Sequence, residues 1–220
     1  MIDLELAVLD IAGTTVKDDG QVPRAFARAL SEAGVHVTSG QLDAVRGSSK
    51  REAVRHFIPA GPDRDRIAAS AYESFRKHLT ASYTNGGVTA IDGAEDTFYW
   101  LRRRGTRVVL NTGFDRDITT LLLAALRWDA RIIDAVVCGD DVSRGRPAPD
   151  LIHRAMERAG VTDSARVMNV GDTRLDLRAG QSAGVRWNVG VLSGAHDRST
   201  LEREPHTHLL ASIADLPTLV

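Results

Sequence analysis

Cysteine is scarce in this 220-residue chain, and Cys138 is the only one. One cysteine allows neither an internal disulfide nor a thiolate metal cage. Long apolar runs are also missing, because none approaches the roughly 20 residues of a membrane span. The first residues lack the basic, then apolar, then small-residue order of a signal peptide. These absences predict a cytoplasmic protein with no membrane partner.

The chain has no excess of charge of either sign. Its 28 lysines and arginines nearly balance 29 aspartates and glutamates, which leaves a net charge of -1 at pH 7. This balance gives no reason to expect a nucleic-acid partner. The length allows one large domain, or a domain with an insert, and no internal repeat divides it.

Strand patterns and helix patterns alternate along most of the chain. An alternating apolar run over 4–10 leads to Asp10, and a small-residue turn follows at once, which predicts a strand that ends at this acid. Alternating strands and helices indicate an α/β fold with a doubly wound, Rossmann-like parallel sheet. Further strands are expected at 107–110, 135–138, 167–170, 185–189 and 208–210, with helices at 93–104, 118–126, 150–159 and 175–183.

A block without strands interrupts this alternation after the first strand. Residues 21–82 show the spacing of four helices, and Ser49 with Glu52 matches a capping box at the start of the third. Polar, glycine-containing joints flank the block at 17–20 and 85–87. We therefore expect an all-helical cap at 17–85, inserted into a core formed by 1–16 and 86–220.

Polar side chains follow the predicted strands where each one ends. Asp10 ends the first strand, Thr112 follows the strand at 107–110, and Asp172 follows the strand at 167–170. Asp176 lies one helical turn further on, and Arg146 lies in a rigid Gly-Arg-Pro-Ala-Pro loop. Since ligands of open α/β sheets bind at the carboxyl edge, these side chains are expected to meet there.

The three aspartates suit phosphoryl transfer, which needs a nucleophile and a divalent cation. Asp10 can attack phosphorus and form an aspartyl-phosphate. Asp10 and Asp172 supply hard oxygen ligands for Mg²⁺, and Asp176 can either ligate the ion directly or orient a water.

The remaining groups supply donors to phosphoryl oxygens. Thr112 can donate a hydroxyl hydrogen bond, and Arg146 offers a two-pronged guanidinium. Backbone N–H groups of the turn 11–15 and of Gly113 would complete an anion-binding nest. Taken singly, each side chain also has an ordinary structural interpretation, as a helix cap or a surface residue. Their occurrence together, in this order and at strand ends, favours the catalytic interpretation.

Four segments together resemble the motifs of the haloacid dehalogenase superfamily, and the resemblance covers nearly the whole chain. Ala12, and arginine in the third motif, make the chain similar to the phosphonatase-like family within it. The segments are Asp-Ile-Ala-Gly-Thr-Thr from Asp10, Asn-Thr-Gly from Asn111, Gly-Arg-Pro-Ala-Pro from Gly145 and Gly-Asp-Thr-Arg-Leu-Asp from Gly171.

The resemblance implies a hydrolase of a small phosphonate, such as phosphonoacetaldehyde, with Asp10 as nucleophile. Mg²⁺ would be held by Asp10, the Ala12 carbonyl and Asp172, with Asp176 beside them. The resemblance further implies that a homodimer can form through the cap. Substrate or phosphate would contact six residues: Ile11, Ala12, Thr14, Arg46, Gly113 and Phe114.

Ala12 restricts the reaction, because most phosphatases of the superfamily carry an aspartate there as the general acid. Proton donation of that kind contributes roughly 10²–10⁴ in rate. Its absence favours a leaving group that needs no such proton, such as a carbon that departs as an enamine. An amine that forms a Schiff base with a neighbouring aldehyde would provide that electron sink.

Lys50 is the candidate amine, in a Gly-x-x-Lys segment that resembles the phosphonatase cap. The positive end of its helix and the neighbouring Arg46 and Arg51 are expected to lower its pKa. Two other interpretations stay open, a cation that only grips an anionic substrate and a solvated surface lysine.

The chain departs from the phosphonatase pattern at four positions, two near Lys50, one in the first linker and one after the second motif. Arg46, Ala53, Gly20 and Phe114 stand where the family has methionine, histidine, cysteine and tyrosine. A different phosphonate or a phosphate monoester therefore stays open as the substrate. A binding or regulatory protein with little turnover is a third alternative, which the missing acid at Ala12 supports.

Overall fold

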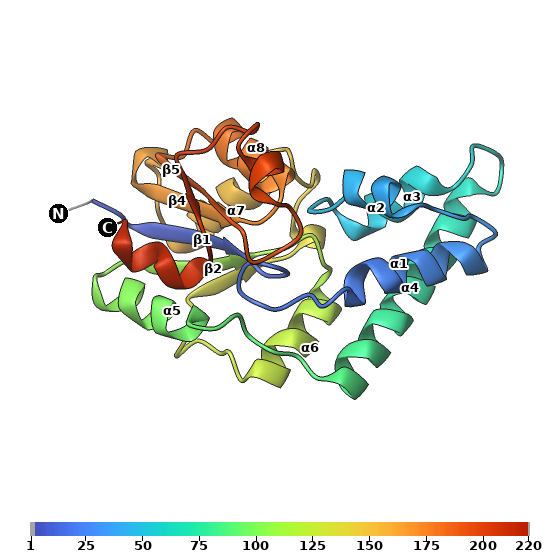
Figure 1. The fold of residues 1–220 in the computed structure, drawn as a ribbon, viewed down its shortest axis with the longest axis horizontal. Coiled ribbons are helices and arrows are strands. Elements are labelled where there is room, and N and C mark those ends of the chain that lie inside the picture. Colours follow the sequence, from blue (N-terminus) through green and yellow to red (C-terminus); the bar gives the residue numbers. More distant parts are fainter. Residues whose placement is uncertain (1–2, 220) are drawn as a thin grey trace.

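The sheet is built around a strand of five fully or almost fully buried residues, β1 (Leu6–Asp10). The computed structural model describes residues 3–219, and its six parallel strands run in the order β3-β2-β1-β4-β5-β6 (Figure 1). The other strands are β2 (Arg107–Asn111), β3 (Ala135–Val137), β4 (Val167–Gly171), β5 (Trp187–Val191) and β6 (His208–Leu210).

The strand order reverses beside β1, and this reversal determines where a ligand can enter. The chain proceeds outward from β1 to β2 and β3, then returns to β4 on the other side and proceeds to β5 and β6. Asp10 lies in register with Asn111, and Leu9 with Val170. The carboxyl ends of β1, β2 and β4 are therefore neighbours at a topological switch point, where open α/β sheets bind ligands.

Helices cover both faces of the sheet, because alternate residues of the buried strands point to opposite sides. Leu6 and Val8 belong to one apolar cluster, with residues of α7 and α8, while Ala7 and Leu9 belong to the other, with residues of α5 and α6. The flanking elements are α5 (Ala94–Arg103), α6 (Arg116–Leu126), α7 (Asp150–Ala159), α8 (Arg174–Ser182), α9 (Arg198–Leu201) and the 3₁₀ helices η1 (Gly139–Asp141), η2 (Ser164–Arg166) and η3 (Ile213–Thr218).

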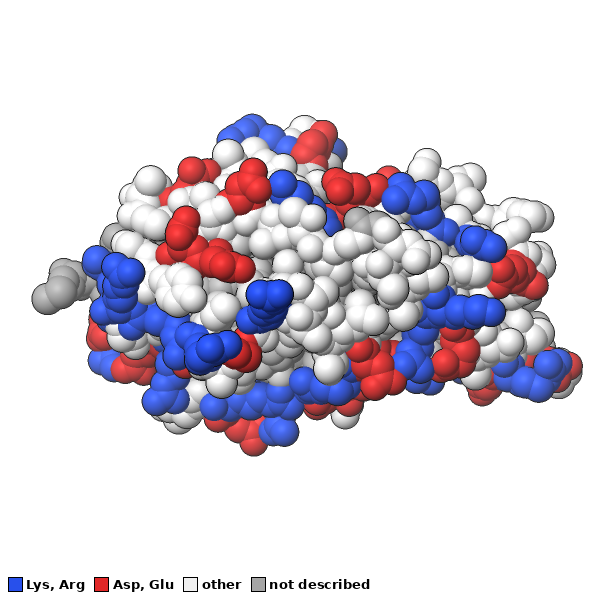
Figure 2. All heavy atoms as spheres, turned by 90° about the horizontal axis from the view of Figure 1, so that it is seen from below, with Lys and Arg blue, Asp and Glu red and all other residues white. Residues whose placement is uncertain are grey.

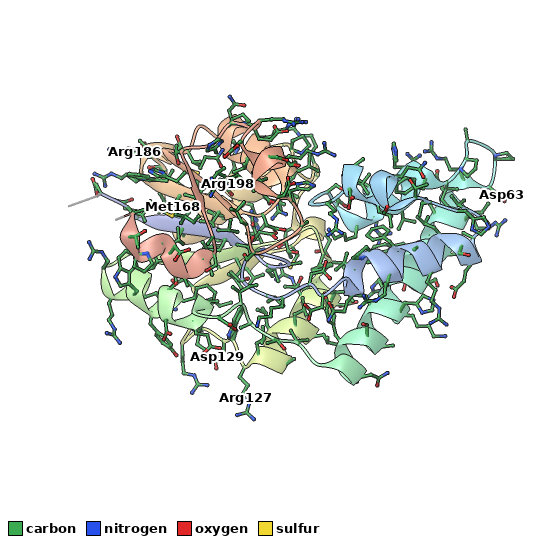
Figure 3. All side chains as sticks on the ribbon, in the orientation of Figure 1. Asp63, Arg127, Asp129, Met168, Arg186 and Arg198 are labelled. Carbon is green, nitrogen blue, oxygen red and sulfur yellow. The ribbon has the colours of Figure 1, made fainter. Side chains whose placement is uncertain are left out.

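Four consecutive helices follow β1 and lie beyond the carboxyl ends of the strands (Figure 1). We call them the helical unit. Phe26 and Phe75 join the first to the fourth, with ring centroids 4.4 Å apart. Asp63 lies at the tip of the unit farthest from the sheet (Figure 3). The helices are α1 (Gln21–Glu32), α2 (Ser39–Ala44), α3 (Lys50–Phe57) and α4 (Arg64–Gly86).

The two segments that connect the helical unit to the sheet pair with each other. Lys17 N–H donates to the carbonyl oxygen of Thr89 at 2.9 Å, and Ile91 N–H donates to that of Thr15 at 2.9 Å. The second joint expected at 85–87 is partly wrong, because α4 continues to Gly86 and only Gly87 leaves the helix, with φ 77°.

Several boundaries differ from the sequence prediction. The first strand begins at Leu6 rather than residue 4, and the strand expected at 185–189 lies two residues later. The capping box at Ser49 is wrong, since the Ser49 side chain caps no helix N–H. The Lys50 N–H instead donates to the Gly113 carbonyl oxygen at 3.1 Å, because α3 begins against the end of β2.

The surface carries charges of both signs. Figure 2 shows basic and acidic side chains interleaved over one face, with uncharged atoms between them. Within residues 3–219, no helix combines the length and the apolar character needed to cross a bilayer.

Candidate active site

A cavity of about 240 Å³ lies between the carboxyl edge of the sheet and the helical unit. The sheet side supplies Asp10, Thr112, Arg146 and Asp172, and the helical unit supplies Lys50. The sequence predicts that the four side chains of the sheet side meet, and the structure brings together Asp10, Thr112 and Asp172 because β1, β2 and β4 are parallel neighbours. Asp176 does not line the cavity and is 1% exposed.

Asp10 and Arg146 form a buried ion pair at the centre of the site. Nη2 of Arg146 lies 2.6 Å from Oδ1 of Asp10, and both residues are about 95% buried. The same guanidinium reaches Asp176 through Nε at 2.9 Å and donates to the Gly47 carbonyl oxygen through Nη1 at 3.3 Å. One arginine therefore joins two carboxylates of the sheet edge to the helical unit.

Asp172 is held by groups on three sides. Its Oδ1 accepts a hydrogen bond from the Thr14 hydroxyl at 3.1 Å, and its Oδ2 accepts the Ala195 N–H at 2.6 Å. Gly13 and Gly194 pack directly on this carboxylate, where a Cβ on either would overlap it. Gly13 also has φ 91°, so both the space and the backbone at this position require glycine.

Asp176 has both carboxylate oxygens engaged. Oδ2 accepts the backbone N–H of Thr173 at 3.0 Å and the hydroxyl of the same residue, which forms a capping box at the start of α8. Oδ1 pairs with Arg146. Direct ligation and orientation of a water were the two roles expected for Asp176, and in this structure its oxygens contact Thr173 and Arg146.

Three buried carboxylates share this edge, since one oxygen each of Asp10, Asp172 and Asp176 lies within 4.8 Å of the others. Burial raises the pKa of Asp10, with Asp176 adding to the rise and Arg146 opposing it. Burial likewise raises the pKa of Asp172, and the charges of Asp10 and Asp176 raise it further. A divalent cation would relieve this repulsion, so the donor set fits Mg²⁺.

Lys50 faces the same cavity from the start of α3. Its Nζ donates to the Ser48 carbonyl oxygen at 3.3 Å and lies 5.2 Å from the centroid of the Phe114 ring. The residue is 8% exposed, which excludes the solvated surface lysine of the sequence alternatives.

The pKa of Lys50 is lowered, as the sequence predicted, but not chiefly by the neighbouring Arg46 and Arg51. Burial is the main cause, the charge of Arg146 lowers the pKa further, and Asp10 opposes both. Arg51 instead lies over the Tyr72 ring, at 4.6 Å from its centroid. Arg46 lines the cavity and pairs with Asp43 through Nε at 2.8 Å.

The turn after β2 forms a second wall of the cavity. Oγ1 of Thr112 accepts the Phe114 N–H at 3.1 Å, which leaves the hydroxyl hydrogen available to a ligand. Gly113 contacts the helical unit closely, because a Cβ there would overlap the carbonyl oxygen of Ser48.

The turn after β1 differs from the anion nest expected at 11–15. The N–H groups of Thr14 and Thr15 donate to the Ile11 carbonyl oxygen, at 3.3 and 2.9 Å, and the Gly13 N–H donates to that of Val16 at 2.7 Å. These three donors are used within the turn, so this part of the expectation is wrong. Ala12 lines the cavity directly.

Two partners of the charged residues were missed from the sequence. The Asn111 side-chain oxygen accepts from Arg146 Nη2 at 2.8 Å, and the Ala195 N–H binds Asp172. Both lie at or after the carboxyl end of a parallel strand, as the other site residues do: Asn111 ends β2, and Ala195 lies in the turn after β5.

A parallel Rossmann-like sheet with buried carboxylates at its carboxyl edge defines an α/β enzyme with a polar active-site cavity. The family model of haloacid dehalogenase-like hydrolases matches residues 7–189. The chain belongs to this family and is a hydrolase.

Individual relatives agree with this assignment. Phosphonoacetaldehyde hydrolase from Parabacteroides distasonis is 28% identical to the chain, over 90% of this chain and 79% of the relative. A phosphonoacetaldehyde hydrolase-like protein from Oleispira antarctica superposes with TM-score 0.86 at 24% identity, covering 99% of this chain and 91% of that one. CbbY from Rhodobacter sphaeroides, in complex with phosphate, superposes with TM-score 0.79 at 22% identity, covering 97% and 96%.

Proposed function

We propose that the protein is a Mg²⁺-dependent hydrolase that cleaves the P–C bond of a small phosphonate, phosphonoacetaldehyde or a related compound. The observation that carries this proposal is the buried Lys50, which shares one cavity with the carboxylate of Asp10. A nucleophile for phosphorus and an amine for a carbonyl group thus face the same small volume. The similarity to phosphonoacetaldehyde hydrolases supports the same reaction.

In this proposal Lys50 acts on the carbonyl carbon. Its neutral amine adds to the aldehyde, and loss of water with uptake of one proton from solvent gives a protonated imine. The lowered pKa favours the neutral amine that this step needs. The face of the Phe114 ring beside Nζ tolerates the positive charge of the imine.

Asp10 then attacks phosphorus. The P–C bond breaks, its electron pair enters the imine to form an enamine, and the phosphoryl group stays on Asp10 as an acyl-phosphate. Water hydrolyses the acyl-phosphate to phosphate, and protonation and hydrolysis of the enamine release acetaldehyde and free Lys50. No proton is needed on the departing carbon while the bond breaks, which agrees with alanine at position 12.

Mg²⁺ would be held by Asp10, Asp172 and the Ala12 carbonyl oxygen. The ion neutralises phosphoryl charge and allows the anionic nucleophile to approach. Arg146 and Thr112 would donate to the phosphoryl oxygens, while Asp176 positions Arg146. The helical unit acts as a cap that excludes water and opens about the paired segments 15–17 and 89–91.

Incubation with phosphonoacetaldehyde and Mg²⁺ tests this proposal. We expect phosphate and acetaldehyde in equal amounts, with loss of both in Asp10→Ala. A panel of phosphate monoesters serves as the comparison. Faster phosphate release from an ester than from any phosphonate would contradict the proposal and favour a monoester phosphatase.

A further inference from the structure

One wall of the cavity is apolar, and the proposed reaction with phosphonoacetaldehyde does not use it. α1 contributes three side chains to this wall, and α2 with its C-cap contributes two. They are Val22, Pro23, Phe26, Leu42 and Val45. Phe26 lies four residues after Val22 and three after Pro23, and Val45 lies three after Leu42, which are the spacings of neighbours on a helix surface.

The charged sheet edge lies at one end of the cavity, and the apolar wall of the helical unit lies at the other. Asp10, Arg146 and Asp172 occupy the end that would bind the phosphonate. The phosphonomethyl group of a carbonyl substrate would extend to the sheet edge, so the second substituent of the trigonal carbonyl carbon would extend away from that edge, toward the helical unit. An aldehyde carries only hydrogen at this position and leaves the apolar wall without a contact.

The two charged residues on this side already have partners. Asp18 Oδ1 accepts the Val22 N–H at 3.2 Å at the start of α1, and Arg46 pairs with Asp43. These contacts hold both side chains within the helical unit. The wall beside them is formed by the five apolar side chains, which an alkyl group matches better than a polar group does.

We propose that the substrate is a 2-oxoalkylphosphonate, in which an unbranched alkyl chain on the carbonyl carbon contacts this apolar wall. The inference rests on the proposed function and specifies its substrate class. The ketone reacts as the aldehyde does, because Lys50 displaces its oxygen as water and the P–C electron pair enters the imine. One water in total is consumed, and the products are phosphate and a methyl ketone.

Phosphate release from 2-oxopropyl-, 2-oxobutyl- and 2-oxopentylphosphonate, with phosphonoacetaldehyde alongside, tests the inference. We expect kcat/KM to rise by about fourfold per methylene within the ketone series, as burial of each methylene predicts. Saturated alkylphosphonates of matching lengths cannot react, so their inhibition constants measure binding alone. These constants should fall as the alkyl chain lengthens, in parallel with the rise in kcat/KM.

A double variant, Val22→Thr with Val45→Thr, keeps the side-chain shape and adds two hydroxyl groups to the wall. We expect the chain-length preference to shrink to less than about twofold per methylene, since a hydroxyl without a partner disfavours an alkyl neighbour. Val37→Thr is the matched control, because Val37 packs in the helical unit without lining the cavity, and it should keep the native preference.

The outcomes separate the inference from the proposed function. Turnover of phosphonoacetaldehyde, with no gain along the ketone series and flat inhibition constants, would overturn the inference and leave the proposed function intact. Unchanged chain-length preference in the double variant would overturn it too, with the wall then serving only as the core of the helical unit. Absence of phosphate release from every phosphonate, phosphonoacetaldehyde included, would overturn both.

Discussion

The backbone N–H of Lys50 donates a 3.1 Å hydrogen bond to the carbonyl oxygen of Gly113. This bond joins the first residue of α3 to the turn after β2, so the Lys50 amine is placed by contact between the helical unit and the sheet. Phe114, the residue after Gly113, lies under Nζ. If Lys50 acts as proposed, its reactivity should depend on closure of the helical unit over the sheet.

Gly113→Ala should prevent this closure. The added Cβ would overlap the Ser48 carbonyl oxygen, and the clash is relieved when the helical unit moves away. We expect kcat/KM to fall by about 10²-fold, the loss typical of a small misplacement of reacting groups. Steady-state kinetics measures the fall in kcat/KM, and small-angle scattering measures the displacement of the helical unit. Gly40→Ala is the control, since a Cβ at Gly40 has no neighbour within 4 Å, and equal activity in both variants would contradict the role of closure.

Borohydride should trap the substrate on Lys50. Because burial lowers the pKa of this lysine, a larger fraction is neutral near pH 7 than for an ordinary lysine. Trapping should increase with pH and approach its maximum below the ordinary lysine pKa of about 10.4. Peptide mass spectrometry locates the adduct. Lys50→Arg keeps the charge without an imine-forming amine and should give no adduct. An adduct at another residue, with full activity in Lys50→Arg, would refute the imine at Lys50.

The stabilising effect of Mg²⁺ should grow as pH rises. The raised pKa values of Asp10 and Asp172 mean that, above pH ~4, the unfolded chain releases protons that the folded protein keeps. The folded protein then binds more protons, so these groups reduce the free energy of unfolding as pH rises. Mg²⁺ binds the deprotonated carboxylates and offsets this loss.

Thermal unfolding with Mg²⁺ and with chelator, at pH values of about 5 and about 8, measures this effect. The increase in Tm on adding Mg²⁺ should be larger at the higher pH. Asp172→Asn removes one carboxylate of the cluster, so it should raise the Tm without metal and abolish most of the increase. An increase that is independent of pH, or one retained in Asp172→Asn, would count against the metal site.

Arg146→Lys should damage both stability and activity. A lysine ammonium cannot reproduce the contacts to Asp10, Asp176 and the Gly47 carbonyl oxygen together, so a buried carboxylate loses its partner. Breaking a buried pair in this way costs about 3–5 kcal/mol, which urea unfolding measures. Arg144→Lys is the control two residues away, because Arg144 pairs with Asp150 at the surface. An equal shift of the unfolding midpoint in the two variants would contradict the structural role of Arg146.

The sequence was most informative at the ends of β1, β2 and β4. Each of these strands is short, mostly apolar and either ends at a polar residue or is followed by one, and parallel neighbours bring such ends together. The order of strands and helices also predicted the Rossmann-like sheet, because the spacing of apolar residues alternates along the chain between two, typical of strands, and about 3.6, typical of helices.

The contacts that cross between segments were not predictable from local patterns. Lys50 owes its low pKa to burial beneath the sheet edge, and no residue near it in the sequence signals that burial. Packing of the helical unit on the sheet edge also places the Gly113 carbonyl oxygen where it accepts the Lys50 N–H. This bond is present in place of the cap expected from the Ser49 side chain. The partnership of Asn111 with Arg146 likewise depends on how the loop before α7 folds over the sheet.

The most direct test of the central claim is acid quenching during turnover of phosphonoacetaldehyde with Mg²⁺, followed by mass spectrometry of the peptide that contains Asp10. The account predicts a phosphoryl group on Asp10 in the native protein and none in Asp10→Asn. Steady phosphate release with no phosphoryl group on Asp10, or with one on another residue, would contradict it.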